Sequence, residues 1–104
     1  TPTLSSAASD VYKRQYPNPF NMNTTIRYRL THAAEIALEV FDLRGRKVAV
    51  LDFGFKQAGS HLSRWDGTTI DGAIAASGVY FYRLAGESIT NDFFDLSQKI
   101  VLVK

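Results

Sequence analysis

The sequence contains no cysteine among its 104 residues, and this absence removes several kinds of chemistry at once. A thiol nucleophile, a zinc site built on cysteine and a disulfide framework are all excluded. Apolar runs are short as well, since the longest, such as Val48–Leu51 and Ile100–Val103, have only four residues. A membrane-spanning helix needs about 20 apolar residues, so no part of this sequence is predicted to cross a bilayer as a helix.

The chain also has little excess of charge of either sign. The chain has 12 basic and 10 acidic residues, a net charge of +2, so composition predicts no nucleic-acid partner. The length suits one hydrophobic core. Thr1–Gln15 is rich in Ser, Thr and Ala and lacks the apolar stretch of a signal peptide. We predict a linker or non-native tail over residues 1–15 and a single domain over residues 16–104.

Alternation of apolar and polar residues over 25–30 and 36–41 is typical of β-strands. Since successive side chains of a strand point to opposite faces, each run has one core face and one wetter face. The run 79–84 has large apolar groups on both faces, which predicts a central strand covered on both sides. Further strands are predicted at 47–53, 59–65, 93–94 and 99–103.

Glycines that follow aspartate or serine predict the turns between these strands. Gly45 lies within Asp42–Arg46, and Asp66-Gly67, Asp71-Gly72 and Ser77-Gly78 follow. Six or seven short strands without helical periodicity predict an all-β fold, an immunoglobulin-like antiparallel β-sandwich. A small closed barrel is the alternative.

No common catalytic constellation is present, so we predict that the chain is not an enzyme and has no catalytic residue or cofactor. His32 and His61 belong to no metal-ligand pair, and there is no GxSxG elbow, phosphate loop or dinucleotide fingerprint. Alternation places His61 on the core side of its strand, beside Trp65. We interpret it as a packed structural histidine rather than a ligand or base.

Two sets of residues have both a functional and a structural interpretation. Asp66 and Asp71 flank a glycine-containing loop and could share a Ca²⁺ ion. Calcium usually collects six to eight oxygens, so the favoured interpretation is that both aspartates form turns. As a second set beside these two aspartates, Tyr80, Phe81 and Tyr82 could stack on sugars or nucleobases, but their alternating spacing favours a core face and a covered second face.

A basic strip is the remaining candidate binding feature. Arg27 and Arg29, together with Arg44, Arg46 and Lys47, could meet an anionic partner. The acidic residues Glu35, Glu39 and Asp42 are close in sequence, so cross-strand pairing on a solvated face is favoured over such a strip.

The segment Tyr16–Asn21 (YPNPFN), followed by Thr24–Tyr28 (TTIRY), resembles the opening of the type A C-terminal sorting domains of the type IX secretion system in Bacteroidetes. The likeness continues through Val40–Val48, with a D-x-x-G-R turn, and through Ser77–Leu84. Lys99–Lys104 resembles the family's K-[MI]-V-L-[LV]-K terminus. The residues of the structural motif are Pro17, Asn18, Pro19, Phe20, Asn21, Gly45, Trp65, Asp66, Gly67, Gly78 and Tyr80.

The resemblance implies a role as a sorting signal for an upstream cargo domain. In that family the type IX translocon recognises the folded domain in the periplasm and carries the cargo across the outer membrane. A sortase-like peptidase then often cuts before the domain and joins the cargo to lipopolysaccharide. The chain is therefore expected to be secreted or at the cell surface. The expected recognition segment is the closing edge strand, a template for strand addition, with residues Lys99, Ile100, Val101, Leu102, Val103 and Lys104.

The sequence departs from the family pattern at three places. Met22 stands where the family usually repeats a proline. Ser63 occupies a position that is usually apolar, which leaves a small void or a hydroxyl in need of a partner. The segment Glu87–Gln98 is longer than the usual final hairpin connection, which makes the pairing of the last strand the least determined part.

Two alternative functions remain open beside sorting. One is a passive immunoglobulin-like accessory module, for example a carbohydrate-binding module. The other is a structural role in assembly, because the middle motifs also resemble the immunoglobulin-like domain of flagellar hook-capping proteins.

Overall fold

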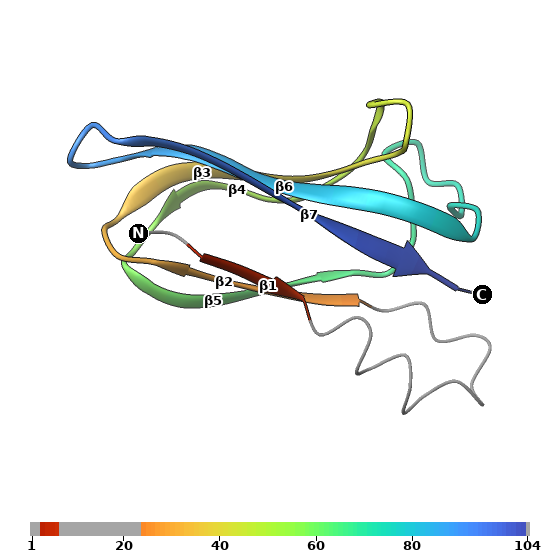
Figure 1. Ribbon diagram of the computed structural model, residues 1–104, viewed down its shortest axis with the longest axis horizontal. Helices are drawn as coiled ribbons and strands as arrows, with labels where there is room; N and C mark the ends of the chain where they lie inside the picture. Colours follow the sequence, from red (N-terminus) through yellow and green to blue (C-terminus); the bar gives the residue numbers. More distant parts are fainter. Residues whose placement is uncertain (1–2, 7–23, 104) are drawn as a thin grey trace.

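The structure is a computed structural model that describes residues 3–6 and 24–103, and these form seven strands in two sheets (Figure 1). One sheet has the order β1-β2-β5 and the other the order β4-β3-β6-β7, with every neighbouring pair antiparallel. The all-β sandwich predicted from the sequence is confirmed. The strands are β1 (Thr3–Ser6), β2 (Thr24–Leu30), β3 (Ala34–Phe41), β4 (Lys47–Lys56), β5 (Gly59–Trp65), β6 (Gly78–Ser88) and β7 (Phe93–Leu102).

None of the described residues lies in a helix, so this part of the chain has no helix long and apolar enough to cross a bilayer. The core lies between the two sheets, where the alternation in sequence places it. The alternate residues of β2 and β3 are buried, from Ile26 to Leu30 and from Ala34 to Val40. Trp65 at the end of β5 packs edge-on against Tyr80 of β6, with ring centroids 5.3 Å apart. Full burial of one such side chain contributes roughly 1.5–3 kcal/mol.

The hairpin between β3 and β4 turns where its glycine predicts. Gly45 has a φ of 82°, a region that glycine adopts without strain. The carboxylate of Asp42 closes the turn by accepting hydrogen bonds from the backbone N–H groups of Arg44 and Arg46, each at 2.9 Å. These bonds favour the ionised carboxylate and lower the pKa of Asp42, with the Arg46 backbone bond as the largest cause.

The last two strands differ from the prediction. A long connection was expected over Glu87–Gln98, but β6 continues to Ser88 and β7 begins at Phe93, so only residues 89–92 connect them. The physical reason lies at Gly86, which is paired with Phe94 across the two strands. A Cβ atom on Gly86 would lie 3.0 Å from the Phe94 ring, so the missing side chain makes room for that ring and extends the pairing.

The outward side of β6 was also predicted incorrectly. The strand is central in its sheet, and its inward residues Tyr80, Tyr82 and Leu84 are buried. The fold has only two layers among the described residues, so no third layer covers Val79 and Phe81, which are half-buried on the outer face.

Part of the segment expected to be a linker or tail forms a strand. Thr3–Ser6 pairs with Ile26–Arg29 of β2, as β1. The domain boundary at residue 16 stays a prediction. The predicted roles of Pro17, Asn18, Pro19, Phe20, Asn21 and Met22 lie outside the described residues.

We predict that Gly86→Ala destabilises the domain by about 1–3 kcal/mol, because its new Cβ would collide with the Glu35 carbonyl oxygen and crowd Phe94. The midpoint of urea unfolding measures this change. Glu87→Ala, at the exposed next position, is the control and should change stability by at most about 0.5 kcal/mol. Equal midpoints for both variants would contradict the proposed close approach of β6 to β3.

Candidate interaction surfaces

Exposed phenylalanines mark the outer face of the four-stranded sheet. Phe53 and Phe55 of β4 are 73% and 55% exposed. Phe53 is paired with Ala37 of β3, which is paired in turn with Ala85 of β6, so an apolar row crosses three strands. We call Phe53, Phe55, Ala37 and Ala85 the phenylalanine face. Contiguous exposed apolar patches of this kind are typical of protein contacts.

A β-bulge places these phenylalanines outside. The register between β3 and β4 shifts at Leu38/Glu39, so Leu51 has no partner in β3. Without that extra residue, simple alternation would put Phe53 on the same face as buried Ala49. The bulge reverses the alternation and turns Phe53 and Phe55 to the outer face.

Charged residues on the same outer face are largely neutralised by neighbours. Lys47 pairs with Glu39 at 2.8 Å, and Arg83 binds both carboxylate oxygens of Asp95 at 2.9 and 2.8 Å. The hydrogen bonds that Arg83 donates to the Asp95 carboxylate raise the pKa of Arg83. Lys47 and Arg83 are thus neutralised, whereas Glu35 and Glu87 are exposed on this face without an ion pair among the described residues.

The basic strip that was considered as the alternative does not form, because its two halves lie on different sheets. Arg44, Arg46 and Lys47 belong to the β3–β4 hairpin, whereas Arg27 and Arg29 lie on β2. The pairing favoured over it is confirmed for Arg46, which binds Asp42 at 2.9 Å, and for Lys47 with Glu39. Glu35 stays exposed opposite Phe55.

A different basic group forms on the outer face of the three-stranded sheet. Arg27 and Arg29 are exposed there, and the register of β2 with β5 adds Arg64, opposite Thr25. Leu62 lies opposite Arg27 and is 64% exposed. We call Arg27, Arg29, Leu62 and Arg64 the arginine face. Sequence reasoning missed Arg64, and the outward position of every second residue in 59–65 was the available signal.

His61 has the structural role that its spacing predicts. Its ring is half-buried and stacks on Tyr28, with centroids 5.1 Å apart, and its Nε2 lies 2.7 Å from the Gln57 carbonyl oxygen. Tyr28 donates its hydroxyl hydrogen to Asp52 at 3.0 Å. Burial, and next the Asp52 carboxylate, raise the pKa of Tyr28. His32 is exposed, and its Nδ1 lies 3.3 Å from Thr31 Oγ1.

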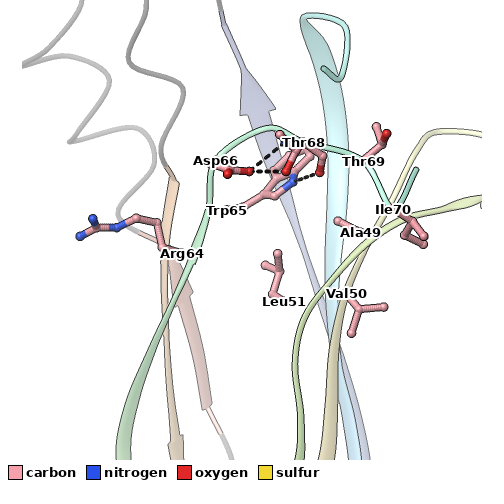
Figure 2. A pocket seen from close by; sticks show the side chains of 9 residues that line it. All are labelled: Ala49, Val50, Leu51, Arg64, Trp65, Asp66, Thr68, Thr69 and Ile70. Atoms are coloured by element: carbon pink, nitrogen blue, oxygen red, sulfur yellow. Dashed lines mark hydrogen bonds between the residues drawn. The ribbon is translucent and has the colours of Figure 1, made fainter. Parts of the chain in front are cut away.

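The loop after Trp65 is held by its own polar groups (Figure 2). The indole Nε1 of Trp65 donates to the Thr68 carbonyl at 2.9 Å, and Asp66 accepts from the backbone and hydroxyl of Thr68 at 3.0 and 2.6 Å. Asp71 accepts a hydrogen bond from the Thr69 hydroxyl. These threonine hydroxyls are the largest cause of the lowered pKa of each aspartate.

Both aspartates thus act within their turns, as the structural interpretation predicts. Over residues 3–6 and 24–103 there is no group of three or more histidine, aspartate or glutamate residues arranged to hold a metal ion. A calcium ion shared by Asp66 and Asp71 stays an untested prediction.

A cavity of about 660 Å³ lies between the edges of β4 and β5, below this loop (Figure 2). Its apolar lining includes Ala49, Leu51, Trp65 and Ile70. The loop covers part of the β4 edge, because Ile70 N–H donates to the Val48 carbonyl at 2.8 Å.

The departure from the family pattern at Ser63 is resolved at the same edge, where its hydroxyl donates to the Leu51 carbonyl at 3.3 Å. Of the two outcomes expected for Ser63, a void or a hydroxyl with a partner, the structure shows the second.

A second cavity, of about 440 Å³, is lined by His32, Ser88 and Asp92 among others. Ser88 and Asp92 both bond Thr90 in this region.

The two tyrosines considered for stacking are core residues. Tyr80 and Tyr82 are buried, and their hydroxyls donate to the Ala76 carbonyl at 2.6 Å and to Gln98 Oε1 at 2.9 Å. The core interpretation is confirmed, and neither ring is available to a sugar or a base.

The segment Lys99–Val103 lies on or just after an edge strand, as expected, but only some of its side chains are exposed. Ile100 and Leu102 are buried in the core, whereas Lys99, Val101 and Val103 are exposed. Lys104 lies outside the described residues. Within the described part of the predicted recognition segment, the accessible groups are these alternate side chains and the backbone edge with which no described strand pairs.

The family model described as the FlgD Ig-like domain matches residues 20–88. No curated protein matches significantly. The structure of FlgD from P. aeruginosa is 22% identical, with a TM-score of 0.62, over 76% of this chain and 61% of that chain. FlgD from Xanthomonas campestris, described in connection with hook capping essential for flagellar assembly, is 23% identical, with a TM-score of 0.62, over 79% and 59%.

A third similar structure is dimeric latent PorU from Porphyromonas gingivalis. It is 21% identical with a TM-score of 0.66, over 99% of this chain and 9% of that chain. The chain thus spans about three fifths of the FlgD chains and a small part of PorU. At these identities the three structures show the fold, an immunoglobulin-like sandwich.

We predict that Asp66→Asn reduces the acid sensitivity of the domain. The pKa of Asp66 is lowered below its ordinary value of 3.8, so its ionised form stabilises the folded state above that pH. This stabilisation is lost as the pH falls through the folded-state pKa. Urea unfolding from pH 6 to pH 2 should show a smaller loss in Asp66→Asn than in the original chain, and parallel curves would contradict the assignment.

Proposed function

The chain belongs to the family of FlgD Ig-like domains, and we propose that it is a non-catalytic immunoglobulin-like module that contacts a neighbouring protein within an assembly. The observation that carries this proposal is the family match over residues 20–88. The description of the X. campestris FlgD structure in connection with hook capping and flagellar assembly supports a role of the same kind.

The phenylalanine face is the surface best suited to such a contact. Its aromatic rings are exposed, and Lys47 and Arg83 beside them already have carboxylate partners, so a partner can bury the row through Phe53 without stranding these cations. Glu35, opposite Phe55, is the exposed charge that the partner would have to leave in water or pair. Exposed phenylalanine is costly to keep in water unless a partner covers it. The neighbouring protein is therefore expected to present an apolar patch of its own.

We expect the double substitution Phe53→Ser with Phe55→Ser, made in the full protein in its native host, to reduce incorporation of that protein into its assembly. The two side chains make no core contact that the change removes, so the protein should fold but sediment as an isolated chain. Leu43→Ser is the matched control, because Leu43 is 69% exposed but lies on the β3–β4 hairpin. Unchanged sedimentation of the double variant would contradict the proposal.

A second candidate function is sorting by the type IX secretion system, and one specific observation favours it. The family match ends at residue 88, yet β7 follows it and overlaps the segment Lys99–Lys104, which resembles the terminal motif of sorting domains. In this proposal the module follows a cargo domain and is recognised by the translocon in the periplasm. The cargo then reaches the cell surface or the medium, with or without cleavage by a sortase.

The exposed half of β7 is the expected contact with the secretion machinery. Lys99 and Val101 point outward, and no other described strand pairs with the outer edge of β7 in its sheet. A partner strand could add there through backbone hydrogen bonds. Deletion of Ile100–Lys104 is a poor test on its own, because it also removes two core residues.

We therefore expect Val101→Glu to trap a reporter fused to the whole chain in the periplasm of a host with the type IX machinery, while the domain stays folded. Val50→Glu is the control, since Val50 is 45% exposed and Val101 is 51% exposed, on opposite edges of the sheet. The fraction of reporter in the medium is the measurement. Equal secretion of both variants would argue against recognition through β7, and no secretion of the original fusion would remove the sorting proposal.

A further inference from the structure

The arginine face brings together three cations that have no carboxylate partner in the described part of the chain. Arg46, Lys47, Lys56 and Arg83 each form an ion pair with a carboxylate. Arg27, Arg29 and Arg64 form no ion pair over residues 3–6 and 24–103. Arg29 donates a long hydrogen bond to Ser60 Oγ, at 3.4 Å. We propose that this face binds an acidic, extended segment of a partner polypeptide.

The spacing of the three arginines fits such a segment. They occupy three successive outward rows of the β2–β5 pair, because Arg64 is opposite Thr25, Arg27 opposite Leu62 and Arg29 opposite Ser60. Rows on one face of a strand repeat about every 6.7 Å, so the three rows span about 13 Å along the strands, with Arg27 and Arg29 on β2 and Arg64 on the neighbouring β5. Acidic residues at alternate positions of an extended chain repeat at the same interval.

The three arginines give this face a positive field, which favours a partner that carries carboxylates. No charge on the described face cancels that field. The outward residues of β2 and β5 include no acidic side chain, and the sequence of β1 is Thr-Leu-Ser-Ser. Asp66 is the nearest carboxylate in sequence to Arg64, but it accepts hydrogen bonds from Thr68. Arg64 also lines the edge of the cavity beneath that loop, but Figure 2 shows its guanidinium group extending away from Leu51 and Val50 on the other side.

Leu62 distinguishes a polypeptide from other polyanions. This side chain is 64% exposed and is paired with Arg27 in the middle row. An apolar side chain between two acidic residues of a peptide can pack on it, whereas a sulfated glycan offers nothing apolar there. The described face also has no aromatic ring on which nucleobases could stack.

Placing these three arginines on one face does not stabilise the folded domain. Arg27 and Arg29 lie on the same face of one strand, about 6.7 Å apart, and like charges so placed repel one another. A purely structural role would require a compensating carboxylate, which is absent among the described residues. This inference is independent of the phenylalanine face, which belongs to the opposite sheet.

The test measures binding of the whole chain to a fluorescent peptide in which glutamate alternates with serine and a leucine lies between the central glutamates. The combined substitution of Arg27, Arg29 and Arg64 by Gln should weaken binding roughly tenfold or more. Arg44→Gln is the matched control, because Arg44 is an exposed arginine on the hairpin, and it should bind like the original chain. The triple variant should unfold at the same or a higher temperature.

Further arms identify the class of partner. Leu62→Ser should weaken binding of the peptide but not of heparin or of an oligothymidylate. A peptide with glutamine in place of glutamate should not bind. The proposal is overturned if the acidic peptide does not bind, if the triple variant binds it equally, or if the heparin or oligonucleotide binds more tightly and Leu62→Ser has no effect on the peptide. Phe53→Ser with Phe55→Ser should leave peptide binding unchanged, so failure of either proposal can be recognised separately.

Discussion

Burial of inward side chains between two separate sheets is the constraint on which the rest of the structure depends. Trp65 shows how it works, since this one side chain packs on Tyr80 of the opposite sheet and bonds the Thr68 carbonyl of the following loop. Loss of a buried tryptophan typically costs about 3–5 kcal/mol, a large part of the stability of a small domain. Because β2, β3 and β6 supply their inward residues to this core, their outward residues are left for contacts.

The outward halves of the two sheets have different chemistry. The four-stranded sheet presents phenylalanine among paired charges, and the three-stranded sheet presents arginine without a carboxylate. A module of this kind can meet two partners at once, on opposite sides and by different forces. Apolar burial acts at one face and is insensitive to salt, while attraction between charges acts at the other and weakens as salt rises.

Local patterns in the sequence predicted the fold but not its surfaces. The core residues of β2 and β3 and the turn at Gly45 follow from period two and from glycine, which are properties of neighbouring residues. The outward position of Phe53 depends on the bulge at Leu51, and the full length of β7 depends on Gly86 making room for Phe94. Arg64 joins Arg27 only through the register of two strands distant in sequence. Such pairings are set by tertiary packing, which alternation alone does not determine.

The unequal lengths of the terminal strands have a mechanical consequence. β1 and β7 run in the same direction in different sheets, so tension between the two ends of the chain loads their hydrogen bonds in shear (Figure 1). The four residues of β1 share that load over a short overlap with β2, whereas the ten residues of β7 are paired with β6 along their whole length. Under a pulling force β1 would detach from β2 while the rest of the sandwich stayed folded. The module would therefore extend at β1 before the β6–β7 pairing broke.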